Sequence, residues 1–151
     1  ILKLAPYLAV LLFASQSQGD TLNRRSAVGA CNPSNKASKG RILFDPFGAL
    51  NRASNGEAYL SCAGDYGITT STAKIGVKDL NSTRNVACSL GLYDEFGNRV
   101  FSGSRVTSGS SSSMVWLQFN PTAGMRAVPF FSCELPRSTS AGLSSVNQIA
   151  W

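Results

Sequence analysis

The sequence of 151 residues contains no histidine, and this absence excludes several kinds of functional site. Nucleophile systems that pair serine or cysteine with an imidazole base are excluded, as are zinc and iron sites with histidine ligands. Charged residues make up only 15% of the chain and hydrophobic residues 43%, so the chain is neither a disordered polyelectrolyte nor a coiled coil. The composition predicts one small globular domain.

Long hydrophobic runs are also missing, apart from one at the start of the chain, between Leu4 and Ala14. A run of about eleven residues has the length of a signal-peptide core and is short of the roughly 20 residues that span a bilayer. Lys3 precedes the run, and small or polar residues follow it. Residues 1–19 are therefore predicted to be a signal peptide that lacks its first residues. The alternative is a retained apolar helix that anchors the protein or packs inside an extracellular filament.

The four cysteines form no C-x-x-C pair, which argues against a zinc knuckle or a thioredoxin-type redox site. An even number of cysteines in an exported chain predicts two disulfides, each contributing on the order of 2–4 kcal/mol. Three pairings are possible. We favour one disulfide that holds the N-terminal arm and one within the folded domain, which pairs Cys31 with Cys62 and Cys88 with Cys133.

Short segments in which apolar and polar residues alternate run through most of the chain, as in Ala73, Ile75 and Val77. Such alternation, with turn residues at short intervals, is typical of an all-β protein. Seven or eight strands are too many for one sheet in a chain of this size, so we expect two packed antiparallel sheets, jelly-roll or immunoglobulin-like. The expected strands are residues 41–44, 58–62, 73–78, 86–92, 99–101, 115–119, 128–135 and 143–151.

The segments between these strands suggest how the domain is organised. Residues 20–40 are polar and without periodicity, which predicts an N-terminal arm before a sandwich domain at 41–151. Asn55-Gly56 predicts a tight turn and residues 94–98 a hairpin loop. The serine-rich stretch 102–113 predicts a flexible loop.

The cysteine framework resembles an uncharacterised family of small secreted four-cysteine β-proteins from Gram-negative bacteria. The resemblance covers essentially the whole mature chain and implies a secreted β-protein, but it implies no activity. This chain has Cys62-Ala63-Gly64 where relatives often have Cys-Pro. The resemblance rests on Cys31-Asn32-Pro33, the step from Gly48 to Asn51, Tyr59-Leu60-Ser61-Cys62, Val86-Ala87-Cys88-Ser89-Leu90 and Phe131-Ser132-Cys133-Glu134-Leu135-Pro136.

Residues that could carry chemistry are sparse. The motif S-x-x-K at Ser71–Lys74 matches that of acylating serine enzymes, but it leads into a predicted strand and its partner motifs are missing. The carboxylates are scattered, so we expect no enzyme, no metal and no cofactor. Asp94, Glu95 and Asn98 in the predicted hairpin loop remain weak candidates for ligand binding.

The function predicted from the sequence is a non-catalytic binding or structural module of the cell envelope or secretome, secreted or periplasmic. Exposed loops at 94–98, 102–113 and 120–124 would carry the interaction. One alternative is a carbohydrate-binding module in which Tyr59 and Trp116, both on the outward side of their strands, stack on sugars. The other is a subunit of an extracellular filament that retains its apolar N-terminus. The partners expected are therefore carbohydrate or another envelope protein. The basic residues behind the net charge of +6 are spread singly along the chain, apart from Arg24-Arg25 and the group of Lys36, Lys39 and Arg41. We expect no nucleic acid and no membrane span after removal of the leader.

Overall fold

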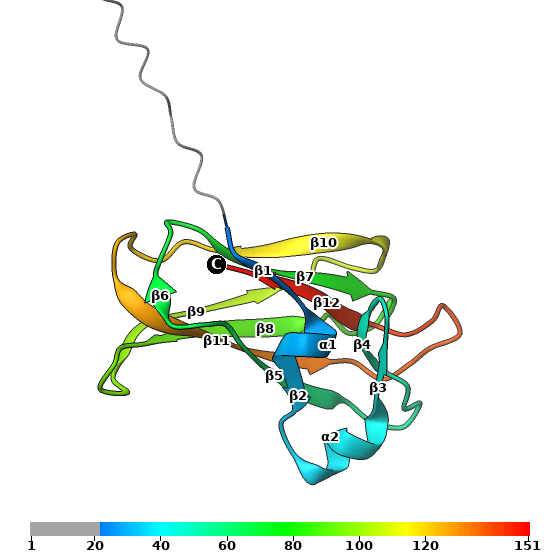
Figure 1. The fold of residues 1–151 in the computed structure, drawn as a ribbon. Helices are drawn as coiled ribbons and strands as arrows, with labels where there is room; N and C mark the ends of the chain where they lie inside the picture. The colour runs from blue at the N-terminus through cyan, green and yellow to red at the C-terminus, as the bar shows by residue number, and fades with distance from the viewer. Residues whose placement is uncertain (1–21) are drawn as a thin grey trace, which may run out of the picture.

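A computed structural model describes residues 22–151, which form two antiparallel β-sheets of six strands each, packed face to face (Figure 1). The prediction of a signal peptide at 1–19, and its filament alternative, lie outside the described residues. Among residues 22–151, no helix is long and apolar enough to cross a membrane.

We call the two layers sheet A and sheet B. Sheet A follows the order β10 (Ser111–Phe119), β7 (Ala73–Asp79), β12 (Ser145–Ala150), β4 (Gly48–Asn51) and β3 (Ile42–Asp45), and β1 (Arg24–Ser26) also pairs with β12. Sheet B follows the order β2 (Cys31–Pro33), β5 (Ala58–Ala63), β11 (Arg126–Leu135), β8 (Ala87–Tyr93) and β9 (Arg99–Val106), and β6 (Gly67–Ile68) also pairs with β11.

The order of the strands distinguishes between the two predicted architectures. After β4 the chain crosses repeatedly between the layers, so that β4-β12-β7-β10 face β5-β11-β8-β9. Two interleaved four-stranded sheets of this order are the jelly-roll arrangement of two Greek keys, and they differ from the immunoglobulin order. The prediction of a disulfide-linked β-sandwich is confirmed, in its jelly-roll form.

The segment 20–40, predicted as a polar arm, belongs to both sheets as far as the structure describes it. Its strand β1 pairs with β12 in sheet A, and its strand β2 pairs with β5 in sheet B. Two short helices, α1 (Ala27–Ala30) and α2 (Lys36–Arg41), interrupt it. They begin at Ser26 and Asn35, whose side chains accept hydrogen bonds from the first turn, a local signal that period-two alternation does not reveal.

The predicted flexible loop at 102–113 also differs from the structure. Most of the stretch 102–113 is strand, because β9 continues to Val106 and β10 begins at Ser111. Backbone pairing in a sheet does not depend on side-chain size, so a serine-rich sequence is compatible with it. Asn55-Gly56 lies in a bend between β4 and β5, which belong to different sheets. The hairpin loop at 94–98 is confirmed, with Gly97 at φ +80°.

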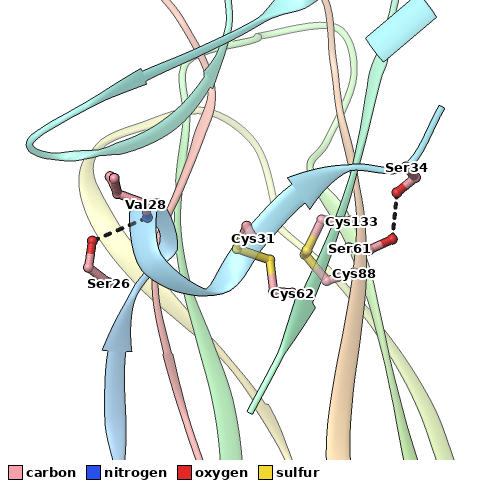
Figure 2. The surroundings of a disulfide bond; sticks show 8 residues. All are labelled: Ser26, Val28, Cys31, Ser34, Ser61, Cys62, Cys88 and Cys133. Atoms are coloured by element: carbon pink, nitrogen blue, oxygen red, sulfur yellow. Dashed lines mark hydrogen bonds between the residues drawn. A yellow bond between two sulfur atoms is a disulfide. The ribbon is translucent and has the colours of Figure 1, made fainter. Parts of the chain in front are cut away.

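Both disulfides lie on the inner face of sheet B and join directly opposed residues on neighbouring strands. Cys31 on β2 bonds to Cys62 on β5, and Cys88 on β8 bonds to Cys133 on β11, which confirms the favoured pairing. Figure 2 shows the two bonds side by side. Each one fixes the register of its strand pair, because a shift by one residue would separate the cysteines.

The core between the sheets is closely packed and contains one buried carboxylate. The rings of Phe119 and Phe131 meet edge to face at 5.9 Å in its apolar part. Asp79 ends β7, is fully buried, and accepts hydrogen bonds from the amide N–H groups of Asn81 and Val86 at 3.0 Å. The hydroxyl of Thr107 is a further donor. Asp79 therefore anchors the connection from β7 to β8.

We expect Asp79→Asn to lower the free energy of unfolding by about 2 kcal/mol, because an amide nitrogen would face one of the two backbone donors whichever way it is oriented. Urea unfolding followed by tryptophan fluorescence measures this change. The matched control is Asp65→Asn, since the Asp65 carboxylate is largely exposed and, within residues 22–151, pairs with Arg25 alone. Asp65→Asn should lower the free energy of unfolding by less than about 0.5 kcal/mol. Equal effects of the two substitutions would contradict the anchoring role.

Candidate functional site

The outer face of sheet B carries a row of small hydroxyl side chains that crosses the sheet. Ser61, Ser132, Ser89 and Ser104 stand opposite one another on β5, β11, β8 and β9. Ser61, Ser89 and Ser132 point outward because their neighbours along each strand, the cysteines among them, point into the core. Ser104 lies on the same face because it pairs with Ser89. The disulfide between β8 and β11 lies one register position from the pair of Ser89 and Ser132, so it holds this row in alignment.

Most of the row is free to bind a ligand. The Ser61 hydroxyl lies 2.6 Å from that of Ser34 (Figure 2). Within residues 22–151, the hydroxyls of Ser89, Ser104 and Ser132 have no hydrogen-bond partner in the protein. Each hydroxyl can donate one hydrogen bond and accept two. The row is therefore a line of uncharged donors and acceptors that faces solvent.

Aromatic rings border one side of this row. Phe130 stands opposite Gly91, and its ring meets that of Tyr93 edge to face at 6.5 Å. Gly91 makes room for Tyr93, because a Cβ atom at this glycine would lie 2.8 Å from the tyrosine ring. Tyr93 therefore lies along the sheet surface over Gly91.

Another aromatic ring borders the opposite side of the row. Tyr59 on β5 stands opposite Glu134 on β11, and its side chain is 39% exposed. The serine row thus runs between Tyr59 on one flank and the pair of Tyr93 and Phe130 on the other. Flat apolar rings beside hydroxyl groups match the mixed surface of a sugar, which has apolar ring faces and polar edges.

Two adjoining hollows give this face a concave surface. One, of about 340 Å³, contains Tyr93, Phe130 and Arg99, and the other, of about 250 Å³, contains Tyr59 and Glu134. Both are also lined by the same three serines, Ser89, Ser104 and Ser132. Because they share this row, the two hollows form one shallow groove, which we call the serine groove.

The groove offers binding groups but no arrangement for acid–base or metal chemistry. Glu134 is the only carboxylate among the residues that line it. Glycoside hydrolysis by the usual route needs a pair of carboxyl groups. No group of three or more histidine, cysteine, aspartate or glutamate residues that could hold a metal ion occurs in the part of the chain that the structure describes.

The structure does not bring Tyr59 and Trp116 together. Tyr59 lines the serine groove on sheet B, whereas Trp116 lies on β10 of sheet A, on the opposite side of the sandwich. The Lys74 ammonium lies 4.9 Å from the centre of the Trp116 ring, and Met114 packs with the indole over Gly76. Trp116 therefore covers the outer face of sheet A.

Asp94, Glu95 and Asn98 lie in the β8–β9 hairpin, directly beyond the Tyr93 end of the serine groove. The Asp94 carboxylate accepts hydrogen bonds from the Phe96 and Asn98 amides at 3.0 and 2.8 Å, which closes the turn. Desolvation acts to raise the pKa of Asp94, but hydrogen bonds from Asn98, Phe96 and Gly97 outweigh it, so the pKa lies below its ordinary value. Asp94 is occupied in shaping the hairpin.

Sequence reasoning missed Tyr93, Phe130 and the serine row. The signal was present, because Ser89 and Ser132 alternate with buried residues just as Tyr59 does. What was missing was the pairing of β8 with both β11 and β9, which places these outward residues side by side.

No family model and no curated protein matches this chain. Among solved structures, it is similar to the module TmCBM61 in complex with β-1,4-galactotriose, at 11% identity and a TM-score of 0.45, over 87% of this chain and 88% of that one. It is similar to a family two carbohydrate esterase from Cellvibrio japonicus, at 10% identity and a TM-score of 0.47, over 86% of this chain and 33% of the esterase chain. It is also similar to the carbohydrate-binding module CBM36 in complex with calcium and xylotriose, at 13% identity and a TM-score of 0.42, over 84% of this chain and 97% of that module. At these identities the likenesses concern the fold alone.

Proposed function

We propose that this protein is a non-catalytic binding module whose serine groove holds an extended, uncharged carbohydrate chain. The observation that carries the proposal is the row of unpartnered hydroxyls at Ser89, Ser104 and Ser132, aligned between aromatic rings on both flanks. Sugar hydroxyls would exchange hydrogen bonds with the serines, while pyranose faces would stack on Tyr59 and Tyr93. The shallow, open form of the groove suits a chain that continues beyond both ends.

The spacing of the row also supports a polymeric ligand. Neighbouring strands lie about 4.8 Å apart, so the serine hydroxyls recur at roughly this interval across β11, β8 and β9. This interval is close to the length of one sugar unit in an extended glycan. A chain lying perpendicular to the strands would therefore meet an equivalent polar group at each successive unit.

The disulfides fit an oxidising compartment, and we propose that the protein works outside the cytoplasm, secreted or periplasmic. Membership of the secreted four-cysteine family of Gram-negative bacteria is part of the same proposal. In that setting a binding module would contact envelope or environmental glycans.

An array of linear glucans, galactans and xylans, with their uronate-containing counterparts, tests the proposal. We expect binding to uncharged chains, which calorimetry with the tightest hexasaccharide then quantifies. Tyr93→Ala and Tyr59→Ala should each weaken binding about tenfold, as expected for aromatic contacts near the centre of an interface. The double variant Ser89→Ala/Ser132→Ala should also lose about tenfold, because two hydrogen bonds are removed with little change in volume.

The control is Phe47→Ala, which removes an exposed aromatic ring from the β3–β4 hairpin of sheet A. Its affinity for the same hexasaccharide should equal that of the unaltered protein. The proposal fails if no glycan on the array binds. It also fails if Phe47→Ala weakens binding as much as Tyr93→Ala in proteins with matching thermal unfolding.

A further inference from the structure

The outer face of sheet A, opposite the serine groove, has an excess of positive charge. Arg24 on β1 and Lys74 and Lys78 on β7 lie on this face, and none of the three forms an ion pair within residues 22–151. Apart from Asp45, the described acidic residues lie elsewhere or are occupied: Glu57 and Asp65 pair with arginines, Asp79 is buried, and Asp94, Glu95 and Glu134 belong to sheet B or its hairpin.

One carboxylate, that of Asp45, lies at the far end of this face. It accepts hydrogen bonds from the amides of Phe47 and Gly48 at 2.8 and 3.0 Å and thereby holds the β3–β4 turn. It forms no ion pair with Lys78, although both residues line the same hollow. The three cations therefore remain available to an external anion.

The pairing register sets the three cations around the face. Arg24 stands opposite Ala150 on β12, which stands opposite Lys74 on β7, so the two cations are about 10 Å apart. Lys78 follows four residues along β7, about 13 Å away. Trp116 lies at the Lys74 end, with the Arg24 guanidinium 6.0 Å from its ring centre.

The same face carries apolar groups at the Lys78 end. A hollow of about 430 Å³ is lined by Leu50, Leu80, Met114 and Leu143 beside Lys78. Phe47 at its rim is 79% exposed, and Leu43, opposite Leu50 on the edge strand β3, is 42% exposed. Protruding apolar side chains next to unpaired cations form what we call the basic–apolar face.

We propose that the basic–apolar face docks on an anionic lipid surface. Lysine and arginine side chains would contact phosphate groups, while Phe47 and Leu43 would enter the boundary between headgroups and acyl chains. A soluble polyanion would satisfy the cations but would leave both apolar side chains in water, so the combination favours lipid. Docking through sheet A leaves the serine groove pointing away from the membrane, and it does not depend on the glycan proposal.

Sedimentation with vesicles of phosphatidylcholine, with and without phosphatidylglycerol, tests this inference on the full chain. We expect binding only with phosphatidylglycerol, weakening as ionic strength rises. Each cation near an anionic surface contributes about fivefold in affinity, so Lys74→Gln/Lys78→Gln should weaken binding about 25-fold. Phe47→Ser should weaken it separately, without changing the charge.

The matched control is Arg126→Gln/Arg137→Gln, which removes the same charge from exposed positions on and beside β11 of sheet B. This control should retain binding to within about fivefold, because only the general attraction of the net charge is reduced. Equal weakening by the two double variants would overturn the proposal, as would equal binding to phosphatidylcholine alone.

Two further measurements separate lipid from other occupants of this face. Dextran sulfate that binds as tightly as the vesicles, and equally well to Phe47→Ser, would overturn the proposal in favour of a polyanion site. A dimer in light scattering that Phe47→Ser dissociates would overturn it in favour of an interface between copies. A monomer in which Phe47→Ser weakens binding to vesicles but not to dextran sulfate would support it.

Discussion

Replacing Cys88 and Cys133 together by alanine should lower the free energy of unfolding by about 4 kcal/mol. The bond closes a loop of 45 residues, and the loss of chain entropy in the unfolded state then gives roughly this value. Both cysteines are buried in the core on the inner face of sheet B, so alanine also removes packed sulfur atoms. Urea unfolding under non-reducing conditions, followed by tryptophan fluorescence, measures the change.

The other disulfide provides the comparison. Cys31→Ala/Cys62→Ala opens a loop of 31 residues, and the same entropy argument gives a loss only slightly smaller. Dithiothreitol should destabilise the unaltered protein and should have no further effect on a variant that lacks all four cysteines. A loss below about 1 kcal/mol for either pair would contradict the argument from loop entropy.

The Cys88–Cys133 variant also tests how the serine groove is held. Because this bond lies next to the pair of Ser89 and Ser132, its removal loosens the register that aligns the hydroxyls. We expect weaker glycan binding even at temperatures where the variant remains folded. Calorimetry with the same hexasaccharide would detect it.

Asn51→Asp should be similarly costly, on the order of 3–5 kcal/mol. Asn51 is completely buried at the end of β4, and its amide nitrogen lies 3.0–3.1 Å from the carbonyl oxygens of Gly56, Leu135 and Pro136. A carboxylate there would place negative charge against three acceptors and lose every hydrogen bond that the amide donates. Thermal and urea unfolding both report the loss.

The control for this change is Asn120→Asp, since Asn120 is exposed and uses its side-chain oxygen to accept a hydrogen bond from Gln118. Asn120→Asp should lower the free energy of unfolding by less than about 0.5 kcal/mol. The deficit of Asn51→Asp should shrink as pH falls, because protonation restores a donor and removes the buried charge. A deficit that is independent of pH would argue against the role assigned to the three carbonyl groups.

Much of the fold was predictable because hydrophobic alternation is a local property. Ala73, Ile75 and Val77 lie on the buried side of their strand as their spacing indicates, and so do Cys88 and Leu90. The hairpin at 94–98 was predictable from its Gly and Asn residues for the same reason. The pattern failed where other local forces decided the structure, as in the capped helices within 20–40.

The sequence by itself determined that the chain is an all-β sandwich with two disulfides, and which side of each main strand faces the core. Only the tertiary structure decided which outward residues meet, because the order of strands in a sheet arises from contacts between distant segments. Tyr59 and Trp116 have the same alternation pattern, yet jelly-roll crossovers place them on opposite sheets. The same crossovers bring Ser61, Ser132 and Ser89 into one row, although 71 positions separate the first two and 43 the last two.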